Sequence, residues 1–117
     1  MIFLILCQEN SMITFHPDLY VSDKLKKREN RIRRSLRMRR GTLGVYLICI
    51  NNGSDQFEIF NAGILKQKHF RKVDLKIIGL CDSMSDAETY IEHLLEDVLK
   101  ETGRPDMKSY MMKGFQK

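Results

Sequence analysis

A run of basic residues between positions 24 and 40 is the strongest chemical feature of the sequence. Ten of its seventeen residues are Lys or Arg, and Glu29 is its single acidic residue. Guanidinium groups bind phosphate oxygens in a bidentate manner, and each cation that neutralises a phosphate releases a counterion. The run therefore predicts contact with a polyanion, above all the phosphate backbone of DNA or RNA. The candidate phosphate-binding residues of the run are Lys24, Lys26, Lys27, Arg28, Arg31, Arg33, Arg34, Arg37, Arg39 and Arg40.

A second basic cluster occupies residues 66–72 and interleaves cations with an aromatic residue. Lys68 and Arg71 flank Phe70 there, and an aromatic ring between cations can stack on a nucleic-acid base. In the alternative, Phe70 is buried and the cations protect a sheet edge from aggregation. Lys68 and Arg71 are therefore candidate nucleic-acid-binding residues as well, and the binding interpretation gains weight if this cluster and the first run share a surface.

Other roles for the basic run stay open. Residues 1–40 hold ten basic and four acidic residues, whereas residues 81–117 hold five basic and eight acidic ones. The run could thus pair with the acidic end of its own chain, or with that of a second copy in a homodimer. It could also be a solvated helix face, or lie on anionic lipid, although its narrow apolar stripe has no aromatic residue.

Signals for catalysis are few. The sequence has no glycine-rich phosphate loop, so no cofactor is predicted. Carboxylates near the start of the last predicted helix could hold Mg²⁺ for phosphoryl chemistry, but such residues more often complement the helix dipole. The sequence favours first a non-enzymatic accessory protein that binds nucleic acid, and second an interaction or assembly module that pairs the basic helix with an acidic protein surface. A small enzyme with a carboxylate-bound metal comes third, and no residue is assigned as catalytic or metal-binding. The carboxylates are those of Asp82, Asp86, Glu88 and Glu92.

The cysteines and the N-terminal residues indicate a cytoplasmic protein. Cys7, Cys49 and Cys81 are odd in number and widely spaced, unlike a disulfide framework or a zinc site. The apolar stretch that opens the chain is too short to span a bilayer and lacks the features of a signal peptide. It is either a strand or an upstream extension that precedes a functional start at Met12.

The elements that must position the basic run follow from periodicity. A helix over residues 23–40 is predicted, capped by Ser22 or Asp23 and ended by Gly41. Its apolar stripe consists only of Leu25, Ile32 and Leu36, so the helix is expected to dock loosely or to project. Before it, residues 16–18 (His-Pro-Asp) indicate a turn.

The rest of the chain predicts an antiparallel hairpin, a third strand and a covering helix. Residues 43–50 and 56–60 are strands joined by a turn at 51–55, and residues 73–80 form the next strand. Residues 85–102 are a strongly amphipathic helix with Ser85 at the N-cap and Glu88 at N3, followed by Gly103 and Pro105. Residues 107–115 add a fourth strand or lie on the core.

The predicted architecture is one α+β domain. Residues 1–21 form an N-terminal segment, and residues 22–117 form a three- or four-stranded, mainly antiparallel sheet with the basic helix and the C-terminal helix. The order of elements resembles that of double-stranded-RNA-binding domains. That family contacts phosphates through lysines at the start of its last helix, where this chain has Asp82, Asp86 and Glu88, so the family's binding mode is not expected here.

Overall fold

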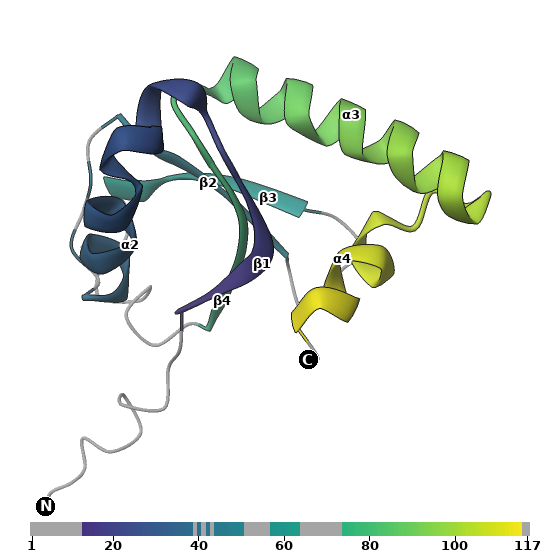
Figure 1. Cartoon of the computed structure of the whole chain (residues 1–117), viewed down its shortest axis with the longest axis horizontal. Coiled ribbons are helices and arrows are strands. Elements are labelled where there is room, and N and C mark those ends of the chain that lie inside the picture. The colour runs from purple at the N-terminus through teal and green to yellow at the C-terminus, as the bar shows by residue number, and fades with distance from the viewer. Residues whose placement is uncertain are drawn as a thin grey trace, which may run out of the picture.

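The computed structural model describes residues 13–38, 40, 42, 44–50, 57–63 and 74–115 (Figure 1). Several expectations fall outside these residues: the turn at 51–55, the cluster at 66–72 with Lys68 and Arg71, Arg39, and the apolar start of the chain. The described elements follow in the order β1 (Ile13–Val21), the 3₁₀ helix η1 (Asp23–Arg28), α2 (Glu29–Arg37), β2 (Tyr46–Ile50), β3 (Phe57–Asn61), β4 (Leu75–Cys81), α3 (Met84–Thr102) and α4 (Met107–Phe115).

The sheet is open and mixed, with four strands in the order β1-β4-β2-β3. The predicted hairpin is confirmed, because β2 and β3 pair antiparallel with Ile48 opposite Ile59. Strand β4 pairs antiparallel with β2 but parallel with β1. The α+β class is therefore confirmed and the sheet is less antiparallel than expected. The fourth strand is β1, not residues 107–115, which form helix α4 instead.

Strand β1 contains the residues that were predicted to be a turn. Its pairing with β4 skips from Phe15, opposite Ile77, to Tyr20, opposite Gly79. Residues 16–19 thus bulge out of the ladder, as expected for a segment whose proline has no N–H to donate. The His-Pro-Asp sequence correctly indicated an irregular backbone at residues 16–18. The irregularity lies inside an edge strand, however, and does not end the strand.

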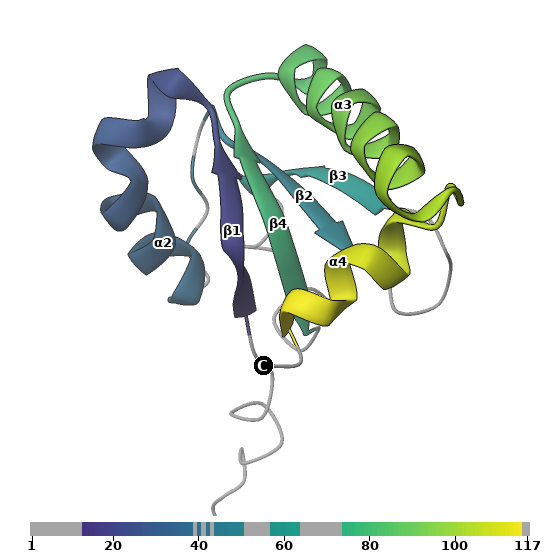
Figure 2. The same cartoon turned by 45° about the vertical axis from the view of Figure 1, so that its right-hand side comes forward.

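Helical layers cover both faces of the sheet, as Figure 2 shows. On one face, Leu25 of η1 and Ile32 and Leu36 of α2 pack against the sheet and are at most 2% exposed. The expectation that this segment docks loosely is therefore wrong, since all three residues of its narrow stripe are buried. The predicted single helix over 23–40 is also not found, because a 3₁₀ segment precedes α2 and α2 ends at Arg37.

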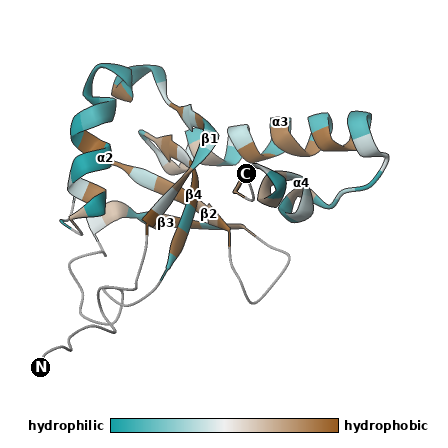
Figure 3. Cartoon of the chain, turned by 60° about the horizontal axis from the view of Figure 1, so that its bottom comes forward, coloured by the Kyte–Doolittle hydropathy of each residue, from teal (hydrophilic) through white to brown (hydrophobic). Residues whose placement is uncertain are grey.

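Helices α3 and α4 cover the other face. Ala87, Leu94 and Val98 of α3 and Met111 of α4 belong to a cluster with the β2 and β4 side chains that point to this side. Hydrophobic residues predominate along β2, whereas α2 and α3 alternate between hydrophobic and hydrophilic residues (Figure 3). Apolar residues along β2 and β4 are thus buried on both faces, which explains their nearly continuous hydrophobic sequence.

The N-terminus of α3 begins two residues earlier than predicted. Ser83, not Ser85, is the N-cap, and its Oγ accepts a hydrogen bond from the Asp86 backbone N–H at 3.0 Å. The C-terminus is as predicted: Gly103 has φ of 74° and its N–H donates to the Leu99 carbonyl at 2.9 Å. The left-handed conformation at this position favours glycine.

Candidate functional site

The burial of one face of η1 and α2 turns their basic side chains toward solvent. Arg33 is half-buried, and Arg39 lies outside the described residues. The other eight predicted cations are exposed, and we call them the basic surface: Lys24, Lys26, Lys27, Arg28, Arg31, Arg34, Arg37 and Arg40.

Two intramolecular ion pairs neutralise part of this charge. Lys26 Nζ lies 3.0 Å from Asp23 Oδ1, in a pair whose side chains are both largely exposed. Arg33 Nη2 lies 2.7 Å from Glu29 Oε2, and Arg33 Nε donates to the same oxygen at 2.9 Å. Within the described ranges, no ion pair is formed by the remaining cations of the basic surface. Arg33 is therefore the predicted residue least available to a ligand.

Phe15 of β1 positions two of the arginines. The guanidinium carbons of Arg33 and Arg37 each lie 5.0 Å from the centroid of the Phe15 ring. Cation–π contacts at such distances stabilise by about 0.5–1 kcal/mol at exposed sites. Sequence reasoning missed this role because it depends on β1 lying beside α2.

The acidic side of the molecule lies across the sheet from the basic surface. Exposed carboxylates line α3, which packs on the face opposite to α2 (Figure 2). Among the described residues, no ion pair joins the two helices. The interpretation in which the basic run pairs with the acidic helix of its own chain is therefore not supported for the body of α3, which the sheet separates from α2. Only the first turn of α3 lies near η1. The exposed acidic residues of α3 are Glu88, Glu92, Glu96, Asp97 and Glu101.

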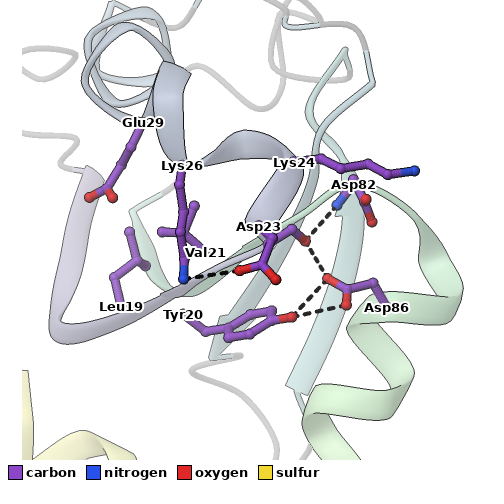
Figure 4. A pocket seen from close by; sticks show the side chains of 10 residues that line it. Leu19, Tyr20, Val21, Asp23, Lys24, Lys26, Glu29, Asp82 and Asp86 are labelled. Carbon is purple, nitrogen blue, oxygen red and sulfur yellow. Dashed lines mark hydrogen bonds and ion pairs between the residues drawn. The ribbon is translucent and has the colours of Figure 1, made fainter.

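A crevice lies where the parallel strands β1 and β4 end. The chain leaves β1 into η1 on one face of the sheet and leaves β4 into α3 on the other face. In open α/β sheets, ligands bind at such a topological switch point, outside the carboxyl ends of the strands. The crevice has a volume of about 710 Å³. Its polar lining comes from Tyr20, Ser22, Asp23, Lys24, Lys26, Glu29, Asp82 and Asp86 (Figure 4).

Asp86 is the centre of a hydrogen-bond network on one wall of this crevice. The Tyr20 hydroxyl donates to Asp86 Oδ1 at 2.9 Å and to Oδ2 at 3.1 Å, and the Ser22 hydroxyl donates to Oδ2. Ser22 Oγ in turn accepts from the Asp82 backbone N–H at 3.0 Å. Tyr20 also stacks on Tyr90 with ring centroids 4.4 Å apart. This network ties the end of β1 to the first turn of α3.

The same surroundings keep the neighbouring groups protonated. Burial, together with the hydrogen bond to Asp86 and its negative charge, raises the pKa of Tyr20 to about 12. Burial and the nearby Asp86 carboxylate also raise the pKa of the Cys81 thiol to about 12. Both groups therefore stay neutral near neutral pH. Asp86 is thus a saturated acceptor that holds structure, and neither Tyr20 nor Cys81 is activated as a nucleophile.

Two charged side chains of the crevice, those of Asp82 and Lys24, have no ion-pair partner in the described part of the chain. Within the described ranges, the Asp82 carboxylate has no hydrogen-bond or ion-pair partner, although its backbone N–H is bonded to Ser22. Lys24 likewise forms no ion pair there. The crevice therefore holds four carboxylates, those of Asp23, Glu29, Asp82 and Asp86, beside the ammonium groups of Lys24 and Lys26, so its formal charge is negative.

Metal binding by the carboxylates near the start of α3 has less support from the structure. In the part of the chain that the structure describes, no three His, Cys, Asp or Glu side chains gather so as to hold a metal ion. The carboxylates from Asp82 to Glu92 thus form no metal site of this kind. Cys49 and Cys81 are buried free thiols on opposite faces of the sheet, so they do not pair with each other.

A second cavity of about 510 Å³ lies between β1, α3 and α4. Its buried polar residue is His16, whose Nδ1 accepts a hydrogen bond from the Asp18 backbone N–H at 3.0 Å. The imidazole meets Phe115 edge to face, with ring centroids 5.2 Å apart. His16 therefore anchors α4 to the bulge of β1, a role that its place in a predicted turn did not indicate.

Comparisons with known proteins give no relative. No family model matches the chain, and no curated protein or solved structure matches it either. Among the described helices, none is both long enough and apolar enough to cross a membrane.

Proposed function

We propose that the protein is a non-enzymatic accessory protein that binds nucleic acid through the basic surface. Its cations contact phosphates, and few side chains on this surface are suited to reading bases. The observation that carries the proposal is the set of exposed Lys and Arg side chains without a carboxylate partner in the described part of the chain. Burial of the apolar stripe fixes their orientation toward solvent.

The geometry of α2 suits a phosphate backbone. Its nine residues span about 13 Å at 1.5 Å per residue. Duplex DNA carries one charge per about 1.7 Å of its axis, so several phosphates lie within reach of this helix. The acidic residues of α3 lie beyond the sheet, where they repel a bound strand least.

The test is binding of a labelled duplex DNA and a labelled single-stranded RNA at about 50 and 200 mM salt. The test variant is Arg31→Gln with Arg34→Gln. The matched control is Lys100→Gln with Arg104→Gln, which removes the same charge from exposed positions near the end of α3. Binding that falls steeply with salt and is weakened only by the first variant supports the proposal. Absence of binding at the lower salt refutes it.

The second candidate is a protein-interaction module. The observation that favours it is the acidic outer side of α3, which gives a second copy a surface complementary to the basic surface. Such a contact joins different surfaces of the two copies, so it is heterologous. A salt-sensitive oligomer with no affinity for nucleic acid would support this candidate over the first.

We also infer a cytoplasmic location. Cys49 and Cys81 are buried as free thiols, which suits a reducing compartment. Burial raises the pKa of the Cys49 thiol well above its ordinary range, so it is unreactive there. Recovery of the tagged protein in the membrane or secreted fraction would contradict this inference.

A further inference from the structure

The outer side of α2 is the part of the basic surface that faces away from the sheet. Ile32 and Leu36 hold the inner side of this helix against the sheet and are at most 2% exposed. At about 100° per residue, Asn30 and Arg34 lie opposite this buried pair. The outer side of α2 thus combines three guanidinium groups with one amide. The exposed residues of α2 are Asn30, Arg31, Arg34 and Arg37.

Helix α2 carries no unpaired carboxylate. Glu29 is its single acidic residue, is half-buried, and lies 2.7 Å from the guanidinium of Arg33. The other carboxylates of the crevice lie around the start of η1, where two of the predicted lysines stand among them. Their negative charge opposes a phosphate at that end. The cations most available to a nucleic acid are therefore those of α2 and, at the end of η1, Lys27 and Arg28.

Asn30 is the uncharged member of this exposed set. Its side-chain amide is exposed and forms no hydrogen bond with a described residue. An amide presents a carbonyl acceptor beside N–H donors. This pair matches the N7 acceptor and the amino group of adenine, which both lie in the major groove of a duplex. Asn is less favourable than Ala or Arg within a helix, so helix stability does not explain Asn30.

The dimensions of α2 suit the major groove of duplex DNA. A helix with its side chains is about 10–12 Å wide, and the major groove of B-form DNA is about 12 Å wide. The nine residues of α2 cover about four base pairs along this groove. Helix α2 forms an outer layer beside β1, on the opposite side of the sheet from α3 and α4 (Figure 2). The major groove of duplex RNA is too deep and narrow for the same approach.

We propose that α2 enters the major groove of duplex DNA, where the amide of Asn30 binds the edge of an adenine while Arg31 and Arg34 bind phosphates. This inference rests on the proposed nucleic-acid binding and names the class of nucleic acid and the residue that contacts a base. It gives the protein a preference for duplexes with an adenine at one position of the site. Contacts between cations and phosphates alone do not provide such a preference.

The experiment starts from a pool of DNA duplexes with a randomised core of about 12 base pairs, which exceeds the length that α2 covers. Repeated rounds of binding to the protein and amplification select a preferred duplex. The readout is the ratio of the dissociation constant of a duplex with a scrambled core to that of the preferred duplex, from fluorescence anisotropy at one salt concentration. We expect a ratio of about ten or more, with an adenine at one fixed position of the core.

The variant Asn30→Ala separates base contact from electrostatics, because it changes no charge. It should bind the preferred duplex about tenfold more weakly and bind the scrambled duplex as before. Ala favours a helix more than Asn does, so the variant is expected to keep its fold. Lys27→Gln is the matched control, because it removes an exposed cation from the same surface. It should weaken binding of both duplexes equally and leave their ratio unchanged.

A chemical change in the DNA tests the groove independently. The analogue 7-deazaadenine lacks the N7 acceptor in the major groove but keeps the charge and the base pairing of adenine. At the fixed position it should weaken binding of the unmodified protein and have no further effect on binding of Asn30→Ala. Additive losses from the analogue and the variant would overturn the inference.

The outcomes separate this inference from the proposed function. If no preferred duplex is selected, or if Asn30→Ala leaves the ratio unchanged, the inference is overturned. Salt-sensitive binding of duplexes or single strands would still support the proposed function in that case. Equally tight binding of an RNA duplex with the preferred sequence would also overturn the inference. If neither DNA nor RNA binds at about 50 mM salt, both fail.

Discussion

The hydroxyl of Tyr20, at the end of β1, donates hydrogen bonds to both carboxylate oxygens of Asp86, in the first turn of α3. The two residues are 66 positions apart in the chain. Their contact links the two connections that diverge onto opposite faces of the sheet. The shape of the crevice therefore depends on Asp86, even though Asp86 itself has little capacity left for a ligand.

The first prediction concerns this contact. Replacement of Asp86 by Ala leaves the hydroxyls of Tyr20 and Ser22 without their acceptor, so we expect the free energy of unfolding to fall by about 2–3 kcal/mol. Urea denaturation followed by circular dichroism measures the change. The control is Glu88→Ala, at an exposed position of the same helix, which should change stability by less than about 0.5 kcal/mol. Equal losses in the two variants would contradict the structural role of Asp86.

The second prediction concerns alkaline pH. Tyr20 and Cys81 have folded pKa values of about 12, raised from ordinary values of 10.0 and 9.0. Because the folded state disfavours their ionised forms, their contribution is fully present below pH 9. It is then lost as the pH rises to 12. The free energy of unfolding should thus decrease over this range, by up to about 1.4 kcal/mol per pH unit for each group.

The variant Tyr20→Phe isolates one of these groups. Its stability should decline less steeply between pH 10 and 12 than that of the unmodified protein, because the Tyr20 titration is absent. The difference in phenolate absorbance between the two proteins gives the Tyr20 titration directly. A midpoint near pH 10 in that difference would show that Tyr20 is not held by Asp86 as described.

The third prediction tests the docking of α4. A Cβ added at Gly114 would overlap Nε2 of the His16 imidazole, closer than a non-bonded contact allows. The buried imidazole has little room to move. Gly114→Ala should therefore displace α4 and reduce stability by about 1–3 kcal/mol, measured by urea denaturation, with faster hydrogen exchange confined to α4.

A double-mutant cycle shows whether His16 is the cause. With His16 replaced by Ala, the methyl group at position 114 has space, so Gly114→Ala should cost much less in that background. Lys113→Ala, at an exposed position of α4, is the control for helix substitution as such. Additive effects of the His16 and Gly114 substitutions would rule out the steric explanation.

The sequence predicted those parts of the fold that depend on local patterns. The hairpin of β2 and β3, the body of α3 and its end at Gly103 follow from alternation, amphipathic periodicity and glycine preference. The three-residue stripe of Leu25, Ile32 and Leu36 is buried, as its spacing indicated. The narrowness of the same stripe predicted loose docking, because sequence alone does not show how well the sheet surface matches it.

The parts that were missed depend on contacts between distant residues. Ser83 and Ser85 each begin a sequence that resembles a capping box, since an acidic residue follows three positions later. The contacts of Asp86 with Tyr20 and Ser22 favour Ser83, and these contacts exist only because β1 lies parallel to β4. The crevice depends on the same parallel pairing, so no local pattern could reveal it.

The last prediction concerns the charge on the basic surface. Arg31 and Arg34 are exposed and have no ion pair in the described part of the chain, whereas Arg33 is paired with Glu29. If each exposed arginine neutralises one phosphate, their joint replacement by Gln should reduce the slope of log K against log salt concentration. The expected reduction is about 1.8 for duplex DNA and about 1.4 for a single strand. Titrations at four or more salt concentrations measure these slopes.

Arg33 supplies the internal comparison for that measurement. Arg33→Gln removes one formal charge, as Arg31→Gln does, but the lost cation was already neutralised by Glu29. The slope should therefore change less for Arg33→Gln than the reduction of about 0.9 expected for Arg31→Gln with duplex DNA. Equal changes would mean that binding responds to net charge alone. A smaller change for Arg33→Gln would mean that the strand contacts the outward face of α2 that burial of Ile32 and Leu36 creates.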